Sequence, residues 1–223
     1  MKHIRKDGWH SLSLFPTDQI WLAPLLADRN AVLLHSAAAI VDGQGLLFVG
    51  HSDAGKSTTM ELLKAARGEG ETGRQGDKEI RGAGLQVEIL CDDRNVIRKW
   101  DSSPISNPQS PIPNLQSPIP GGWRVHGTWS HGTTADVSPA SAPLAAILFL
   151  QKMEENAIIS IDDRRDIRRR LLACVVRPMV TADWWHKTLD LIEQMARQVP
   201  CYVMRFDQSG AIVAGLVGLA DCS

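Results

Sequence analysis

Apolar residues along the chain follow two different spacings, which predict strands mixed with helices. Apolar runs at residues 31–41 and 46–49 are separated by Asp-Gly-Gln-Gly, and turn residues between two strand-like runs predict a β-hairpin. Residues 56–67 place apolar side chains three and four positions apart, as an amphipathic helix does. The same reasoning predicts strands at 85–91, 94–100, 144–150 and 201–206 and helices at 20–28, 162–176 and 183–198. The expected fold class is therefore α/β with a mixed sheet.

Two segments interrupt this pattern. Six of the 18 glycines fall in 68–84, which we expect to be a mobile loop, and six of the 12 prolines fall in 103–120. The second segment repeats itself, because NPQSPIP at 107–113 and NLQSPIP at 114–120 match at six of seven positions. Dense proline cannot pair inside a sheet, so this repeat is either a surface insertion or a polyproline II ligand for another protein. The chain is expected to be one domain, 1–223, with these two insertions.

Charge and cysteine content limit the partners and the cellular compartment expected for the protein. Lys and Arg total 24 against 25 Asp and Glu, and this near-neutral balance argues against a nucleic-acid partner held by bulk charge. The four cysteines are dispersed, which is typical of reduced thiols in a cytoplasmic protein. No apolar run is long enough to span a bilayer, so no membrane partner is expected. The small apolar stretch at 211–220 either packs internally or forms a homo-oligomer contact.

The strongest chemical motif lies between the hairpin and the 56–67 helix. The segment GHSDAGKST fits GxxxxGK[ST], in which glycines let backbone N–H groups converge on phosphate oxygens at a helix N-terminus. Lys56 is expected to reach the β- and γ-phosphates and Ser57 to bind Mg²⁺. The motif predicts a site for ATP or GTP with Mg²⁺, formed by Gly50, His51, Ser52, Asp53, Ala54, Gly55, Lys56, Ser57 and Thr58.

A nucleotide site also needs a carboxylate for the metal ion. Asp92 and Asp93 follow the strand expected at 85–91, so they join Ser57 as candidate metal ligands, although aspartate is also common in simple turns at strand ends. His35 ends an apolar run shortly before the phosphate loop. Its position is compatible with a catalytic role and with an ordinary core histidine.

These pieces together resemble a known family. LLHSAAAIVDGQGLLFVGHSDAGKSTT followed by ILCDD is similar to the catalytic domain of the HPr kinase/phosphorylase family, which shares its nucleotide-binding core with ATP-dependent phosphoenolpyruvate carboxykinases. WRVHGTWSHGTT, APLAAILFLQK and PCYVMRF resemble, more narrowly, the SynChlorMet cassette protein C group, which is associated with peptide-modification gene cassettes. The resemblance implies that Asp92 is the base for a Ser hydroxyl, supported by Asp93 and His35, with Lys56 on the phosphates.

The resemblance also leaves alternatives open. Arg124, His126 or Arg177 are candidates for supplying positive charge to the transferring phosphoryl group. Asp53 places an acid where the family has a neutral residue, and it would repel a triphosphate unless it points outward. The family's signature segment for the phosphorylated protein substrate is not found in the sequence. The function expected is an ATP-dependent Ser/Thr kinase acting on a protein or peptide, or else a non-catalytic nucleotide-binding accessory module; carboxykinase activity lacks the residues it would need.

Overall fold

A computed structural model describes residues 3–6, 9–12, 17–69, 85–100, 121–177 and 181–221. The Pro-rich repeat lies outside these residues, as does the Gly-rich segment apart from its first two residues, which end α2. The helices are α1 (Thr17–Ala27), α2 (Lys56–Glu69), α3 (Arg164–Cys174), α4 (Ala182–Gln198) and α5 (Ile212–Asp221). The strands are β1 (His3–Lys6), β2 (Trp9–Leu12), β3 (Ala31–Val41), β4 (Gln44–Val49), β5 (Val87–Cys91), β6 (Arg94–Trp100), β7 (Gly122–His126), β8 (Ser141–Lys152), β9 (Ala157–Ser160) and β10 (Cys201–Phe206).

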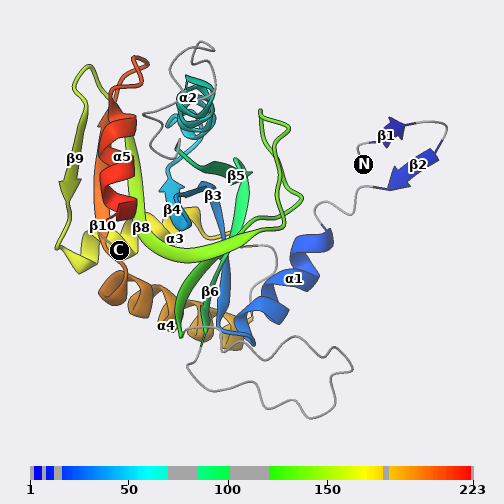
Figure 1. Ribbon diagram of the computed structural model, residues 1–223. Coiled ribbons are helices and arrows are strands. Elements are labelled where there is room, and N and C mark those ends of the chain that lie inside the picture. Colours follow the sequence, from blue (N-terminus) through cyan, green and yellow to red (C-terminus); the bar gives the residue numbers. More distant parts are fainter. Residues whose placement is uncertain are drawn as a thin grey trace.

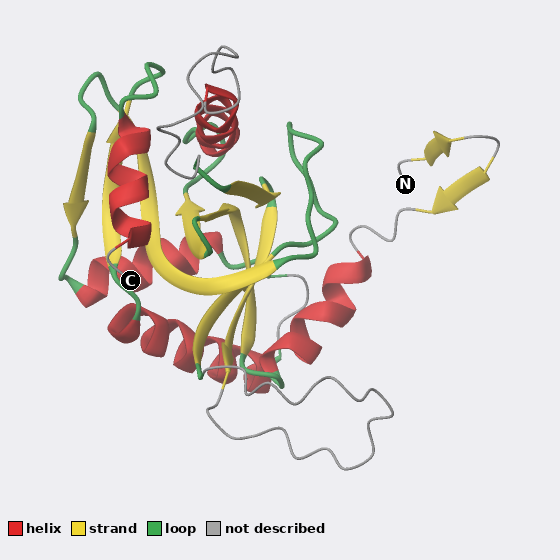
Figure 2. Cartoon of the chain, viewed as in Figure 1, coloured by secondary structure: helices red, strands yellow, loops and turns green. Residues whose placement is uncertain are grey.

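The mixed sheet predicted from the sequence is confirmed (Figure 2). β3 pairs antiparallel with β4, which is the predicted hairpin, and also antiparallel with β5 and β6. β4 and β8 are parallel, and so are β8 and β10. β1 and β2 form a separate antiparallel pair. The expected β6 strand is present, but it does not neighbour β5, because the two strands pair with successive halves of β3.

Five of the strands pair in a closed ring, in the order β3, β6, β7, β8 and β4. The ring closes because the long strand β8 curves, so that its first residues pair with β7 and its later ones with β4 (Figure 1). The strands approach so closely that a Cβ added to Gly45 would lie 2.3 Å from Val125 Cγ1. Gly45 therefore allows β4 and β7 to approach more closely than a side chain at this position would.

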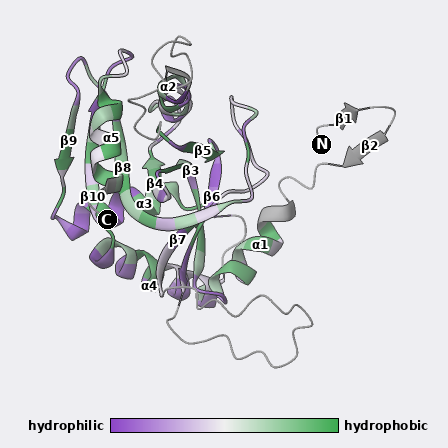
Figure 3. Ribbon diagram, in the orientation of Figure 1, coloured by the Kyte–Doolittle hydropathy of each residue, from purple (hydrophilic) through white to green (hydrophobic). Residues whose placement is uncertain are grey.

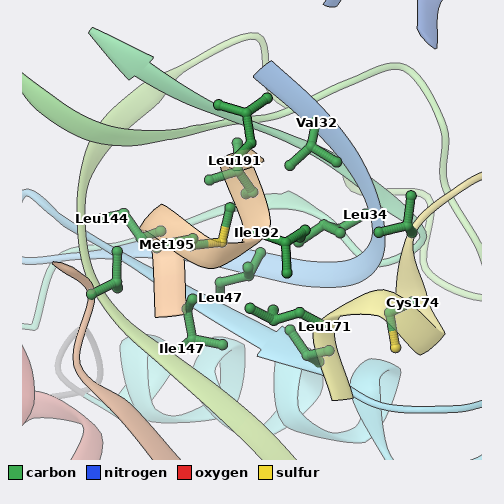
Figure 4. Close-up of a cluster of buried hydrophobic side chains, with 14 of the residues drawn as sticks. Val32, Leu34, Leu47, Leu144, Ile147, Leu171, Cys174, Leu191, Ile192 and Met195 are labelled. Atoms are coloured by element: carbon green, nitrogen blue, oxygen red, sulfur yellow. The ribbon is translucent and has the colours of Figure 1, made fainter. Parts of the chain in front are cut away.

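Helices cover the two faces of the sheet unequally. α1, α3 and α4 pack on one face, where Leu171, Leu191, Ile192 and Met195 lie against strand residues such as Leu34, Leu47 and Ile147 (Figure 4). The amphipathic pattern of α4 is visible in Figure 3 as a hydrophobic side and a hydrophilic side. α2 and α5 pack on the other face of β3, β4 and β8. One side of α5, formed by Ile212, Val213, Leu216 and Ala220, is therefore buried in the core.

Several elements differ from those expected. α1 begins at Thr17 instead of residue 20, and α3 is shorter at both ends than the expected helix over 162–176. β7 and β9 were not predicted, since strands of only five and four residues are too short to show a clear alternation of apolar and polar positions. None of the helices in the described part of the chain is long and apolar enough to cross a membrane.

Candidate functional site

The Gly50–Thr58 segment connects β4 to α2, as its strand-loop-helix context predicts. The conformation of this loop leaves no room for a side chain at Gly50 or Gly55. A Cβ at Gly50 would lie 2.6 Å from Ala54 Cβ, and Gly55 adopts φ of 106° with Phe206 Cζ only 2.5 Å from where a Cβ would be. Any larger residue at either position would push the loop away from the helix N-terminus. The two glycines therefore hold the loop in its tight conformation.

Lys56 is folded back onto this loop. Its Nζ donates hydrogen bonds to the carbonyl oxygens of Gly50, at 3.0 Å, and His51, at 3.1 Å. The residue is buried, and burial lowers the pKa of its ammonium group, while the nearby carboxylates of Asp93 and Asp92 act in the opposite direction. The Lys56 ammonium group can exchange its two hydrogen bonds to carbonyl oxygens for stronger ones to anionic oxygens while the backbone conformation of the loop stays the same.

Asp92 is surrounded by donors. Its carboxylate accepts a hydrogen bond from the Ser57 hydroxyl at 2.9 Å and three from the backbone N–H groups of Gly132, Thr133 and Thr134, at 2.6, 3.1 and 3.0 Å. Burial alone would raise the pKa of Asp92, but these hydrogen bonds outweigh it and lower the pKa. The group is therefore a carboxylate at neutral pH, and it accepts protons poorly.

Asp93 belongs to a second set of contacts. Its Oδ1 lies 3.1 Å from His35 Nδ1, and its Oδ2 accepts a hydrogen bond from the Ser130 hydroxyl at 2.6 Å and lies 3.3 Å from Arg94 Nε. The hydrogen bond from His35 is the largest cause that lowers the pKa of Asp93, to about 2. Because an ionised carboxylate only accepts hydrogen bonds, His35 donates from Nδ1 to Asp93, and Nε2 is the ring nitrogen that does not take part in this contact.

Asp92 and Asp93 are adjacent in the chain, but their side chains contact different partners. The register with β3 runs without a break from Ala38↔Cys91 to His35↔Arg94, and the Ser36 N–H bonds to the Asp93 carbonyl at 3.0 Å. The pair thus sits at the junction of two strands within one antiparallel run, not at a free strand end. Residues 92 and 93 form a bend between β5 and β6, and at this bend the Asp92 side chain contacts Ser57 while the Asp93 side chain contacts His35.

One cavity of about 320 Å³ brings these groups together. The predicted site residues that line it are His35, Ser52, Asp53, Gly55, Lys56, Ser57, Thr58, Asp92 and Asp93. Gly50, His51 and Ala54 do not line it, and neither do Arg124, His126 and Arg177, the candidates for extra positive charge.

Three lining residues were missed. Gly132 and Thr133 belong to the 127–140 loop, and Lys152 ends β8; the sequence analysis used both stretches as resemblance motifs but named no site residue in them. Because β8 is parallel to β4, its C-terminal end reaches the same edge as the phosphate loop. Knowledge of that parallel pairing would have predicted Lys152.

The described residues include no cluster of three or more His, Cys, Asp or Glu side chains able to hold a metal ion by themselves. Ser57 Oγ and Asp92 Oδ2, 2.9 Å apart, nevertheless form a pair of oxygen donors beside Lys56. Mg²⁺ commonly takes only one or two protein oxygens and completes its shell with water and phosphate. The donor set therefore fits a magnesium ion that arrives with a nucleotide, and it does not fit a resident metal centre.

Two substitutions of Asp53 test separately whether its charge and its backbone conformation affect binding in this cavity. Asp53 has φ of 66°, in the left-handed region that favours glycine, and it lines the cavity. We expect both Asp53→Asn and Asp53→Gly to raise MgATP affinity about tenfold at low salt, because each removes a negative charge worth about 1.4 kcal/mol at this range. Titration calorimetry measures the affinity. Unchanged binding in both variants would show that Asp53 points away from the phosphates.

Asp93 should make the protein sensitive to acid. Its folded pKa of about 2 lies below the ordinary 3.8, so its contribution to stability is complete above about pH 4 and is lost as the pH falls towards 2. This contribution is about 2 kcal/mol. Urea unfolding at pH 5, 4 and 3 should show a flatter pH dependence for Asp93→Asn, and His35→Ala should flatten it in the same way. An unaltered slope in both variants would contradict the pairing.

Comparisons with known proteins add a fold likeness only. Neither a protein-family model nor a curated protein sequence matches the chain. Among solved structures, the HPr(Ser) kinase/phosphatase from Coxiella burnetii is similar over 85% of this chain and 96% of its own, with 11% sequence identity and a TM-score of 0.39. The chain thus has a distant structural similarity to an HPr kinase/phosphatase, at a level that carries no argument about its site.

Proposed function

We propose that this protein binds ATP or GTP together with Mg²⁺ and transfers the γ-phosphoryl group to a Ser or Thr hydroxyl of a protein or peptide. The observation that carries the proposal is the 2.9 Å contact between Ser57 Oγ and Asp92 Oδ2, in the cavity that Lys56 also lines. A hydroxyl from the phosphate loop and an aspartate from a neighbouring strand are the two protein groups that hold Mg²⁺ in P-loop nucleotide hydrolases.

The nucleotide phosphates would occupy the loop at the N-terminus of α2. The backbone N–H groups of Gly55, Lys56 and Ser57 are available to anionic oxygens there, and the helix end adds positive potential. Lys56 would exchange the Gly50 and His51 carbonyls for phosphate oxygens. A second cation, Lys152, lines the same cavity, and its Cε would lie 3.1 Å from a Cβ placed on Gly55.

The two aspartates are assigned different roles. Asp92 accepts four hydrogen bonds, one of them from Ser57, and would supply an oxygen to Mg²⁺, whose charge would offset that of the phosphates. The resemblance suggested Asp92 as the base, but its carboxylate already accepts four hydrogen bonds, so we assign this role instead to His35, which is held through Nδ1 by Asp93. Its Nε2 takes the proton of the acceptor hydroxyl as the new O–P bond forms, while the bond from the γ-phosphorus to the bridging oxygen breaks and the nucleoside diphosphate leaves.

The motif-level resemblance to HPr kinase/phosphorylase agrees with this reaction class. We extend the proposal to an acceptor that is a ribosomally made peptide, on the SynChlorMet-like motifs of the sequence. The peptide acceptor and the role in peptide modification stay predictions.

A non-catalytic nucleotide-binding module is the second candidate. The position of Asp53 in the cavity favours it, because a carboxylate beside the loop weakens triphosphate binding and is unusual for an efficient kinase. Such a module would bind nucleotide and respond to it without transferring phosphate.

Labelled ATP distinguishes the two candidates. Wild-type protein, Lys56→Ala and Asp92→Asn would each be incubated with MgATP and a library of Ser- and Thr-containing peptides, with Lys64→Ala as a control because Lys64 pairs with exposed Asp136. Label transferred by wild type and by the control, but by neither site variant, supports the kinase. If the protein binds ATP but transfers label to no peptide, the result supports the non-catalytic nucleotide-binding module.

A further inference from the structure

The 127–140 loop contacts both aspartates of the candidate site. Three successive backbone N–H groups, at residues 132–134, donate to Asp92, whereas the Ser130 hydroxyl donates to Asp93 Oδ2 at 2.6 Å. Backbone N–H groups are supplied by every residue except proline, but a hydroxyl depends on the residue type. The contact with Asp93 is therefore the one that the identity of a loop side chain determines.

The 127–140 loop is fixed at its base. The Gly127 N–H donates to the Ala140 carbonyl at 3.1 Å, which joins the two ends of the loop. The Ser138 N–H donates to the Leu90 carbonyl at 2.9 Å, which joins the loop to β5. A Cβ at Gly127 would lie 2.0 Å from the Ser138 carbonyl oxygen, so only glycine allows this close approach. The residues between these ends are thereby held against the bend at 92–93.

Thr128 fixes Ser130 within the loop. The Thr128 hydroxyl donates to the Arg94 carbonyl at 2.6 Å and accepts a hydrogen bond from the Ser130 N–H at 3.1 Å. One hydroxyl can make both contacts because it donates and accepts at the same time. The first contact ties the loop to the start of β6, one residue after Asp93, and the second holds the backbone of Ser130. Ser130 is thus placed where its own hydroxyl reaches Asp93.

The Ser130 hydroxyl determines which oxygen of Asp93 faces His35. A carboxylate can rotate about its Cβ–Cγ bond and exchange its two oxygens. Oδ2 is occupied by the Ser130 hydroxyl and lies 3.3 Å from Arg94 Nε, so Oδ1 remains for His35 Nδ1 at 3.1 Å. Ser130 does not line the cavity, whereas Asp93 and His35 do. Ser130 can therefore act on a bound substrate only through these two residues.

We propose that Ser130 and Thr128 are positioning residues, which hold Asp93 so that His35 presents Nε2 to the acceptor hydroxyl. The inference rests on the proposed function for the reaction in which His35 takes part. Hydrogen bonds to an ionised carboxylate are among the stronger ones in proteins, so the short Ser130 contact restrains the Asp93 side chain. A base must stay within hydrogen-bond reach of the proton it takes, and a ring that turns freely loses this geometry. The phosphates are held elsewhere, at Lys56 and the loop before α2, so nucleotide binding should not depend on Ser130.

Kinetics with MgATP and the Ser- and Thr-containing peptide library test the effect on the reaction. Ser130→Ala should lower kcat by about tenfold or more, a part of the 10²–10⁴-fold that a general base contributes, while KM for MgATP stays within about twofold of wild type. Ser130→Thr should retain most of the rate because it keeps the hydroxyl. Ser138→Ala is the matched control, since Ser138 is a serine of the same loop whose hydroxyl bonds the exposed Glu88 carboxylate. A kcat for Ser130→Ala equal to that of Ser138→Ala would overturn the proposal.

Nuclear magnetic resonance of the histidine rings tests the positioning without any reaction. Protein labelled with ¹⁵N in its seven histidines would be recorded without nucleotide, and His35→Gln identifies the His35 signals. We expect a slowly exchanging Nδ1–H on His35 in wild type, in Ser138→Ala and in Ser130→Thr. Ser130→Ala and Thr128→Val should show fast exchange of this proton and ring shifts that average over both tautomers. Melting temperatures confirm that each variant is folded. Unchanged His35 signals in both Ser130→Ala and Thr128→Val would overturn the proposal.

The two measurements separate this inference from the proposed function. If wild type transfers label to peptides but neither kcat nor the His35 signals change in Ser130→Ala, the kinase stands and the positioning role is wrong. If wild type transfers label to no peptide, the kinase is wrong, and the His35 signals still decide whether Ser130 and Thr128 hold this histidine in place.

Discussion

Lys56→Ala should lower the affinity for MgATP by about 100-fold or more. Charge-assisted hydrogen bonds are worth about 1.5–3 kcal/mol each, and the ammonium group that now contacts the Gly50 and His51 carbonyls would make two of them to phosphate oxygens. Stability should change much less, because a small side chain at the start of α2 leaves the helix intact. Titration calorimetry gives the affinity and thermal unfolding gives the stability.

Lys64→Ala is the appropriate control for this measurement. Lys64 lies on the same helix and carries the same charge, but its partner is Asp136 on the protein surface. It should bind MgATP as wild type does. A Lys56→Ala protein that is folded and binds MgATP within threefold of wild type would contradict a phosphate-binding role for the loop.

Asp92→Asn should abolish the Mg²⁺-dependent part of ATP binding and slow phosphoryl transfer by about 10²–10³-fold, the size of effect seen when a transition-state charge is left unbalanced. It should also destabilise the fold by about 1–3 kcal/mol. The new amide group must face at least one of the backbone N–H groups of Gly132, Thr133 and Thr134, which leaves buried donors unsatisfied.

The two effects of Asp92→Asn can be measured apart. ATP titrations with Mg²⁺ and with EDTA isolate the metal-dependent affinity, and urea unfolding without nucleotide isolates the structural cost. Asp136→Asn, which removes an exposed carboxylate, should alter neither. Full retention of Mg²⁺-dependent ATP binding by Asp92→Asn would place the metal elsewhere.

The components of the candidate site were recognisable in the sequence because they are local. The hairpin, the two glycines, Lys56, Ser57 and the helix that follows occupy one short stretch of chain, so their mutual geometry depends on few long-range contacts. The pattern also singled out Asp92 and Asp93, although it could not separate their roles. Only the bend between β5 and β6 in the folded chain shows one carboxylate in contact with Ser57 and the other with His35.

The sequence by itself determined the α/β class, the phosphate-loop motif and the residue types that such a loop needs. The tertiary structure alone decided which distant groups join it. Gly132–Thr134 reach Asp92 from a loop 40 to 42 residues later, and Lys152 arrives through a parallel pairing of β8 with β4. The reason is physical: backbone conformation and periodicity act over a few residues, whereas strand order and loop position depend on how the whole set of apolar faces is buried.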